Sequence, residues 1–349
     1  MKEESTRKLL VSSSPHVGSN LTTEKIMLHV IIALSFCLIA GVVIFGVYSL
    51  LTVALCVASS VCGETLYNLI RKRPNTVKDL SAVVTGMILG LNLPPTVPFY
   101  VPIAGGFVAI MFVKMLFGGL GRNFANPAAT ARVFLLLSWS TQMMEYIRPI
   151  DYASGALTVK DFFVGFVDNA AYVTSATPLA DVKSAAGTGN VEVNLLDMFL
   201  GNIPGTIGEV CAVAIIAAAI YLIAFKIIDW KIPLTYFAGI ALFSLVFYKN
   251  GWNFILPNLL GGGVLFAGVF MLTDYATSPN TRAGTIIFAA GAALLTILIR
   301  RYGGMNEGAS FAILLMNLLV PLIDKACKPH PFGYRKPPKV KKEKKEAAL

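Results

Sequence analysis

Residues 27–47 read MLHVIIALSFCLIAGVVIFGV and contain no charged side chain. A stretch of this length can cross the hydrocarbon core of a bilayer as one helix. Similar apolar blocks recur along the 349-residue chain, which is 56% hydrophobic and only 14% charged. Because soluble domains carry roughly 25% charged residues, the sequence predicts an all-α integral membrane protein.

The order of the apolar blocks predicts about ten transmembrane helices, with both termini in the cytoplasm. Three basic residues follow the second block at positions 71–73, and both termini are basic. Basic residues mark the cytoplasmic ends of spans. The pair Arg300-Arg301 is an exception, because it falls outside on this count. The predicted spans are residues 27–47, 48–70, 80–93, 100–117, 128–139, 207–228, 233–248, 254–272, 283–299 and 309–324.

This count divides the chain into five regions. Residues 1–25 form a cytoplasmic N-terminal segment, and residues 26–139 form a first membrane repeat. Residues 140–205 form an extracytoplasmic loop, in which acidic and basic side chains are mixed. Residues 206–325 form a second membrane repeat, and residues 326–349 form a basic cytoplasmic tail.

Two parts of the chain share an order of features that suggests an internal repeat. The run from Pro102 to Gly106 resembles the run from Pro257 to Gly262, and the motif at Asn126-Pro127 resembles Ser278-Pro279 at a similar spacing. Because five is an odd number, two halves of five spans each would be inverted relative to one another in the membrane. Glycine and proline within the spans are typical of broken helices. By the count, however, both Asn/Ser-Pro motifs lie on the cytoplasmic side, so strict inversion requires one re-entrant half-helix. Independent recurrence of glycine and proline is the alternative.

Composition also excludes several classes of protein. The net charge of +10 lies at the termini and in short loops, where it sets topology, so we expect no nucleic-acid partner. The five cysteines form no CxxC motif, and the three histidines are dispersed, which argues against a protein-ligated metal site. No motif for binding nucleotide phosphates and no hydrolase motif occurs.

Polar residues within or beside the spans are the first functional candidates, since they are costly in a membrane. Asn123 and Asn126 lie one helical turn apart, and their amides could recognise the edge of a heterocycle; capping of the next helix is the alternative. Asp274, with Thr277 nearby, could orient a polar ring edge or bind a cation, or could cap a helix. Glu64 is either a functional carboxylate or an interfacial one.

A second candidate is the polar stretch at residues 172–179, YVTSATPL. Small hydroxyl residues followed by a proline make a poor membrane segment and a poor core. The stretch would serve as an exposed attachment point at Thr177, although an ordinary surface loop has the same composition.

Taken together, these motifs resemble those of the NqrB/RnfD family, and the chain length and short N-terminal region resemble its Rnf branch. The resemblance covers residues 10–325. It is carried by GGLG at 118–121 with Asn123 and Asn126-Pro127-Ala128, by Ser175-Ala176-Thr177-Pro178-Leu179, by Thr273-Asp274 with Thr277-Ser278-Pro279, and by Ser13-Ser14-Pro15-His16.

The resemblance implies two flavins and a fold of two inverted five-span repeats similar to urea transporters. It implies that FMN is joined to Thr177 through a phosphoester by an exported flavin transferase, within a motif that includes Ser175 and Ala176. A second, non-covalent flavin, riboflavin or FMN, would lie within the spans, with Asn123, Asn126, Asp274 and Thr277 as its candidate contacts. Two positions depart from the family motif: Ala171 replaces an aspartate, and Ser175 replaces a glycine.

The implied function is that of a flavin-carrying subunit of a redox-driven ion pump in the inner (plasma) membrane. Such a complex passes electrons between ferredoxin and NAD and couples this transfer to movement of Na⁺ or H⁺. This chain has no complete active site for NAD or ferredoxin of its own, so the implied partners include the flavin-carrying G subunit and the membrane A and E subunits. The alternative is a solute channel or transporter of the same repeat architecture without a redox role.

Overall fold

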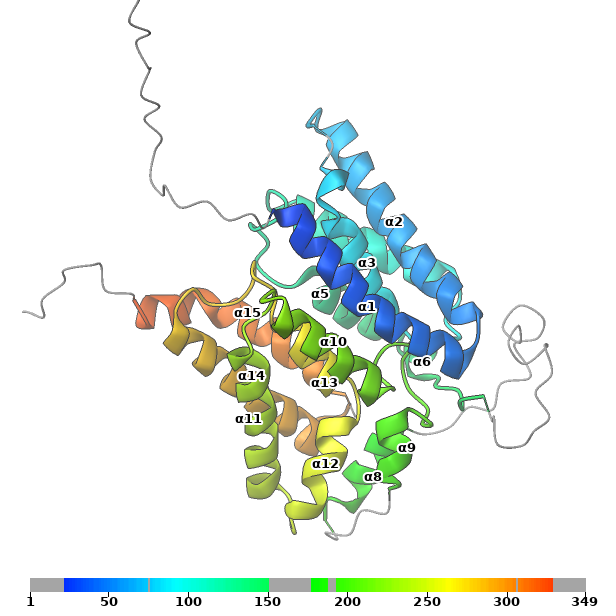
Figure 1. Cartoon of the computed structure of the whole chain (residues 1–349), viewed down its shortest axis with the longest axis vertical. Coiled ribbons are helices and arrows are strands. Elements are labelled where there is room, and N and C mark those ends of the chain that lie inside the picture. Colours follow the sequence, from blue (N-terminus) through cyan, green and yellow to red (C-terminus); the bar gives the residue numbers. More distant parts are fainter. Residues whose placement is uncertain (1–21, 75, 151–176, 188–192, 306, 329–349) are drawn as a thin grey trace, which may run out of the picture.

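The computed structural model describes residues 22–74, 76–150, 177–187, 193–305 and 307–328. These residues fold into helices and contain no β-strand, which confirms the all-α prediction (Figure 1). The helices of the first half of the chain are α1 (Thr23–Phe45), α2 (Tyr48–Ile70), η1 (Val77–Asp79), α3 (Ser81–Leu91), α4 (Tyr100–Phe107), η2 (Val108–Met115), α5 (Pro127–Ser138) and α6 (Ser140–Met144). Those of the second half are α8 (Pro178–Ala185), α9 (Leu195–Leu200), α10 (Ala212–Ala224), α11 (Lys231–Phe247), α12 (Trp252–Leu260), α13 (Val264–Phe266), η4 (Ala267–Met271), α14 (Arg282–Tyr302) and α15 (Ala309–Ala326).

Each predicted span overlaps one helix or, at residues 100–117 and 254–272, consecutive helices, and these differ in length. Four of them, α1, α2, α14 and α15, are long and apolar enough to cross a membrane, and the bent pair of α12 with α13–η4 would make a fifth. Five further apolar helices are shorter: α3, α4–η2, α5, α10 and α11. At about 1.5 Å per residue, a helix of the length of α5 covers about 18 Å of a hydrocarbon core that is about 30 Å thick. The count of ten spans therefore stays a prediction.

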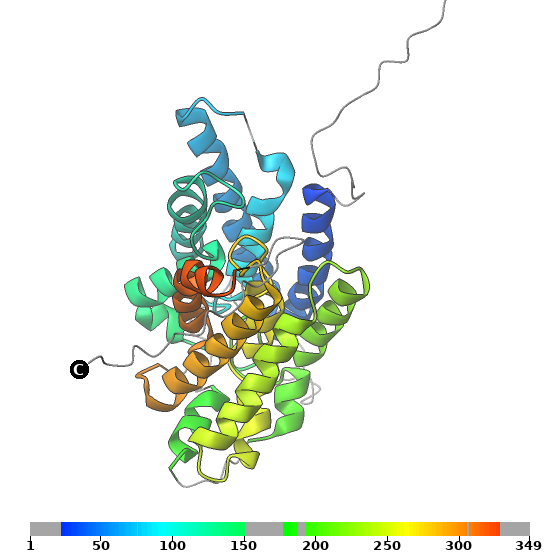
Figure 2. The same cartoon turned by 90° about the vertical axis from the view of Figure 1, so that its left-hand side faces the viewer.

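The two halves of the chain meet along two helix pairs. In Figure 1, α1, α2, α3 and α5 group together, while α11, α12 and α14 form a second group. The turned view in Figure 2 separates the same two groups. Helix α10 packs against α1, and α15 packs against α5. These two pairs form contacts between the first and the second half of the chain.

The two glycine-proline runs occupy different positions in the helices. Gly261, Gly262 and Gly263 separate α12 from α13, and the helix axis bends there by 68°. Gly262 and Gly263 have φ values of 59° and 71°, a left-handed conformation that glycine adopts without steric cost. The corresponding run from Pro102 to Gly106 lies inside α4 without a break. Both runs nevertheless lead into a π-helix, η2 and η4 respectively.

Helices α2 and α3 approach closely because α3 carries two glycines four residues apart. A Cβ at Gly86 would lie 2.7 Å from the Cα of Val57, and a Cβ at Gly90 would lie 2.8 Å from the Cα of Val53. Small residues at this spacing allow backbones of membrane helices to meet without side chains between them.

Replacement of Gly86 by leucine should separate α2 from α3, because the new side chain would overlap backbone that cannot move aside. We expect a loss of about 1–3 kcal/mol, the usual cost of overpacking, measured as a lower thermal midpoint in detergent. The matched control is Gly304→Leu, since a Cβ at Gly304 meets nothing within 4 Å. Equal midpoints for the two variants would contradict the prediction.

Candidate functional site

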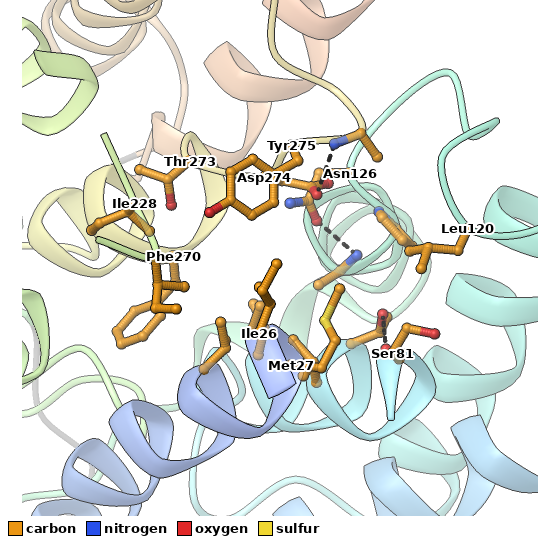
Figure 3. A pocket seen from close by; sticks show the side chains of 18 of the residues that line it. Ile26, Met27, Ser81, Leu120, Asn126, Ile228, Phe270, Thr273, Asp274 and Tyr275 are labelled. Atoms are coloured by element: carbon orange, nitrogen blue, oxygen red, sulfur yellow. Dashed lines mark hydrogen bonds between the residues drawn. The ribbon is translucent and has the colours of Figure 1, made fainter. Parts of the chain in front are cut away.

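One cavity, called the main cavity below because residues from both halves of the chain line it, is drawn in Figure 3. The space between its side chains amounts to about 770 Å³, part of it open to solvent. Most of the lining is apolar. The cavity is lined by Ile26, Met27, Val30, Ser81, Val84, Thr85, Ile88, Lys114, Leu120, Asn123, Asn126, Pro127, Ala128, Leu222, Ile227, Ile228, Val269, Phe270, Thr273, Asp274, Tyr275 and Ala276.

Three of the polar residues selected from the sequence line this cavity together: Asn123, Asn126 and Asp274. Figure 3 shows Asn126 and Asp274 on the same side of the cavity, with Phe270 and Ile228 on another side. The two asparagines come from the turn before α5, and Asp274 follows η4. The fold therefore brings one predicted element from each half to a common site.

Asn126 has a structural role in this cavity wall. Its Oδ1 atom accepts hydrogen bonds from the backbone N–H groups of Ala128 and Ala129, at 3.0 and 3.2 Å, which caps the start of α5. Its Nδ2 atom donates to the carbonyl of Met271, at 3.2 Å, so the same side chain ties α5 to the end of η4. The capping alternative is thus correct for Asn126.

Asn123 differs, because half of its amide is unused. Its Nδ2 atom donates to the carbonyl of Ala125 at 3.1 Å. Its Oδ1 atom is buried and has no hydrogen-bond partner among the described residues. A buried acceptor without a partner is costly, so this oxygen at the cavity wall suits a ligand with an N–H or O–H donor.

Asp274 and Thr277 form one local unit. The Asp274 carboxylate accepts from the Ala276 N–H at 3.2 Å and from the Thr277 hydroxyl at 3.1 Å. These bonds stabilise the turn that follows η4, and the N-cap of the next helix, α14, is Thr281. The capping alternative is therefore wrong for Asp274, which lines the cavity. Thr277 is only 5% exposed and does not line the cavity; it contacts Asp274, which does.

A buried ion pair lies in the wall of the main cavity. Lys114, in η2, donates to a Glu64 carboxylate oxygen at 3.0 Å and to the Ser81 hydroxyl at 2.7 Å. The two charged side chains are 3% and 1% exposed. Glu64 is therefore buried inside the protein and paired, and does not face solvent or lipid. Lys114 was missed by the sequence analysis, although an ionisable residue inside the apolar stretch 100–117 was the available signal.

Thr177 lies at a second, smaller cavity of about 310 Å³, beside Gly261 and Gly262. It is the residue before α8, and its hydroxyl makes no capping hydrogen bond. The expectation that it is exposed is wrong: Thr177 is 8% exposed, because α8 packs against α12 and because residues 203–210 close the cavity. Ser175 and Ala176 of the motif, and Ala171, lie outside the described residues.

A cluster of buried charges adjoins the Thr177 cavity. Arg132, in α5, donates to both Glu209 and Glu307 and also to the Asn92 side chain at 2.7 Å. Glu209 and Glu307 line the Thr177 cavity. None of these three charged residues was predicted to be functional, because the partners lie far apart in the chain. Within the described residues, no group of three or more His, Cys, Asp and Glu side chains is arranged to hold a metal ion.

Two elements connect the two cavities. The segment of α13 and η4 starts beside Gly262 at the Thr177 cavity, and its residues Val269 and Phe270 line the main cavity. Residues 264–271 span about 12 Å at 1.5 Å per residue. Helix α5 also links the two cavities, since its N-cap Asn126 lines the main cavity and Arg132, in its middle, contacts Glu209 and Glu307 at the Thr177 cavity. The two candidate sites therefore lie at the two ends of the α13–η4 segment.

Comparison with known proteins gives consistent matches over nearly the whole chain. A sequence model described as the NQR2, RnfD, RnfE family matches residues 10–333. The chain is 42% identical over 339 residues to the D subunit of the Na(+)-translocating ferredoxin:NAD(+) oxidoreductase complex of Acetobacterium woodii, with 97% of this chain and 98% of that protein covered. It is 36% identical over 335 residues to the D subunit of the proton-translocating ferredoxin:NAD(+) oxidoreductase complex of Clostridium ljungdahlii, with 93% and 96% covered. It is 32% identical over 351 residues to the D subunit of the ion-translocating oxidoreductase complex of Escherichia fergusonii, with 93% and 99% covered.

Removal of Lys114 should destabilise the protein more than removal of the whole ion pair. In Lys114→Met, Glu64 keeps a buried charge without its partner, which costs about 3–5 kcal/mol. The double variant Lys114→Met/Glu64→Gln should regain most of that loss. Thermal unfolding in detergent measures both, with the exposed Lys78→Met as the control. An equal loss in the single and double variants would show that the pairing is not what stabilises this region.

Proposed function

This chain belongs to the NQR2, RnfD, RnfE family, and from that premise we propose that it is the flavin-carrying membrane subunit of a redox-driven ion pump. It is a multi-pass membrane protein with several apolar helices. It serves a ferredoxin:NAD oxidoreductase complex, in which it passes electrons across the membrane and couples their transfer to movement of Na⁺ or H⁺. One matching relative is named for translocation of Na⁺ and another for translocation of protons. The proposal therefore includes both ions.

The observation that carries the proposal is the convergence of Asn123, Asn126 and Asp274 on one largely apolar cavity. A flavin ring has apolar faces and one edge of alternating hydrogen-bond donors and acceptors. The cavity matches this pattern, because its walls are mainly apolar and the Asn123 Oδ1 acceptor has no partner among the described residues. We assign the non-covalent flavin, riboflavin or FMN, to this cavity. When bound, it supplies one- and two-electron transfer, while the protein orients the ring and excludes water.

For the second flavin we propose a phosphoester between the Thr177 hydroxyl and FMN, with loss of one water overall. The motif around Thr177, with Ser175 and Ala176, is the basis of the assignment. Two features of the residue support it: its hydroxyl is not used as a helix cap, and it borders a cavity. The two assigned sites lie at the two ends of the α13–η4 segment, which suits successive steps of one electron path.

The proposal includes a topology and a set of partners. The chain would form ten spans in two inverted five-span repeats like those of urea transporters, with both termini in the cytoplasm and residues 140–205 outside. It would lie in the inner (plasma) membrane with the G, A and E subunits of an Rnf-type complex, and an exported flavin transferase would modify Thr177. The two π-helices at similar places in the halves support the repeat. Arg300, which the predicted topology places outside, is an exception to the rule that basic residues mark cytoplasmic ends. Its burial weakens this exception, because the side chain is not a charge in a loop.

Denaturing electrophoresis with in-gel fluorescence tests the covalent flavin. We expect one fluorescent adduct per chain, with the mass of one FMN less one water, mapped to the peptide that contains Thr177. Thr177→Val should abolish it, since valine keeps the shape and removes the hydroxyl. Thr206→Val, in the same cavity, is the matched control and should keep the adduct. An adduct that persists in Thr177→Val would contradict the assignment, and a colourless protein with solute flux would favour the channel alternative.

Replacement of Asn123 by alanine tests the non-covalent flavin. The variant loses one hydrogen bond to the ring, worth about 0.5–1.5 kcal/mol, so flavin affinity should fall by roughly 2-fold to 10-fold. Equilibrium dialysis of released flavin measures the affinity, and the Thr177 adduct in the same sample should be unchanged. Asn280→Ala is the control, because Asn280 is exposed and does not line the cavity. Unchanged affinity in Asn123→Ala would remove Asn123 from the site.

A further inference from the structure

Arg300 has an unusual environment for a charged residue near a helix end. It lies in the last turn of α14 and is only 2% exposed. None of the salt bridges among the described residues involves it. Its guanidinium instead donates to backbone carbonyls: Nη1 to Asn258 at 2.6 Å, and Nη2 to Gly261 and Gly262 at 2.7 and 2.9 Å.

These three carbonyls belong to the break between α12 and α13. The last carbonyls of a helix have no partner within the helix, and a cation near a helix C-terminus is favourable. The planar guanidinium reaches three carbonyls at once, and its Nη1 atom also contacts the Asn258 side-chain oxygen at 3.3 Å. A lysine offers a point charge without this fixed fork. Arg300 therefore fixes the path of the chain through the glycine break.

The segment that carries Thr177 rests on this break. Leu179 lies two residues after Thr177 and is 3% exposed. A Cβ on Gly262 would overlap the Leu179 Cδ1 atom, and one on Gly261 would lie 3.2 Å from its Cδ2 atom. The Leu179 side chain thus occupies the space that the two glycines leave free, and Thr177 shares its cavity with the same glycines.

A second contact fixes the same segment to the helix of Arg300. Lys183, in α8, donates to the carbonyl of Gly303 at 2.7 Å, and Gly303 follows the last residue of α14. Helix α8 is therefore held at the glycine break through Leu179 and at the end of α14 through Lys183. Arg300 joins these two attachment points, because it belongs to α14 and binds the end of α12.

We propose that Arg300 is a positioning residue for Thr177: it holds the glycine break in the one conformation on which Leu179 and the attachment segment dock. This inference rests on the proposed function only for the statement that Thr177 carries FMN. Loss of Arg300 frees three carbonyls, loosens the break and releases Leu179. The attached cofactor then loses its fixed surroundings, although its covalent bond is untouched.

The test compares Arg300→Gln with Arg301→Gln in the full-length chain purified within its complex. Both variants remove one positive charge from neighbouring residues, but Arg301 makes none of the three carbonyl contacts and lies over the Tyr248 and Tyr302 rings. Amide hydrogen exchange of residues 177–187 should become at least severalfold faster in Arg300→Gln and stay near wild type in Arg301→Gln. The midpoint potential of the Thr177-linked flavin should shift in Arg300→Gln and also in Arg300→Lys, since lysine lacks the fork that binds the three carbonyls. It should stay at the wild-type value in Arg301→Gln.

Leu179→Ala provides the second variant, in case Arg300→Gln does not fold. It removes the docking side chain while leaving the guanidinium contacts, and should give the same faster exchange and the same direction of potential shift. Two results would overturn the inference, provided that the wild type carries the adduct at Thr177. One is wild-type exchange and potential in Leu179→Ala. The other is equal exchange and equal potential in Arg300→Gln and Arg301→Gln. Absence of the wild-type adduct would instead refute the proposed covalent flavin, and the exchange comparison would still decide whether Arg300 holds the segment.

Discussion

Every polar backbone group at an interrupted helix must be satisfied from within the protein where water is excluded, and much of this structure follows from that requirement. The interruption before α5 is capped by the Asn126 side chain, which also binds the carbonyl of Met271 at the end of η4. The interruption after α12 is satisfied by Arg300. In each case one side chain serves two elements that are remote in sequence, and at Asn126 the helix cap is also a link between the halves.

The buried charges follow a related rule. An isolated ion in an apolar interior is expensive, and pairing offsets only part of that cost. Lys114 with Glu64 lies in the wall of the main cavity, while Arg132 with Glu209 and Glu307 adjoins the Thr177 cavity. Both clusters thus lie where a cofactor is proposed. A buried pair with a high desolvation cost contributes little net stability.

The sequence predicted the helices and part of the site for reasons that are local. Apolar blocks define helices by composition, and the polar residues Asn123, Asn126 and Asp274 were recognisable because they interrupt or border such blocks. The partners of Arg132 and Arg300 were not predictable, since no periodicity relates residues that are tens of positions apart. Arg300 was counted as a loop charge for this reason. The burial of Thr177 was missed likewise, because its neighbours come from residues 203–210 and from the α12 break.

The burial of Thr177 bears on when, during folding, this residue could be modified. An enzyme that joins a cofactor to a hydroxyl must reach that hydroxyl, yet this side chain is 8% exposed once α8 has docked. If the hydroxyl is the attachment point, the modification comes before docking, while the chain is still maturing at the membrane. Docking of α8 would then enclose the attached cofactor's phosphoester. In a chain whose α8 docks before modification, Thr177 would stay without flavin.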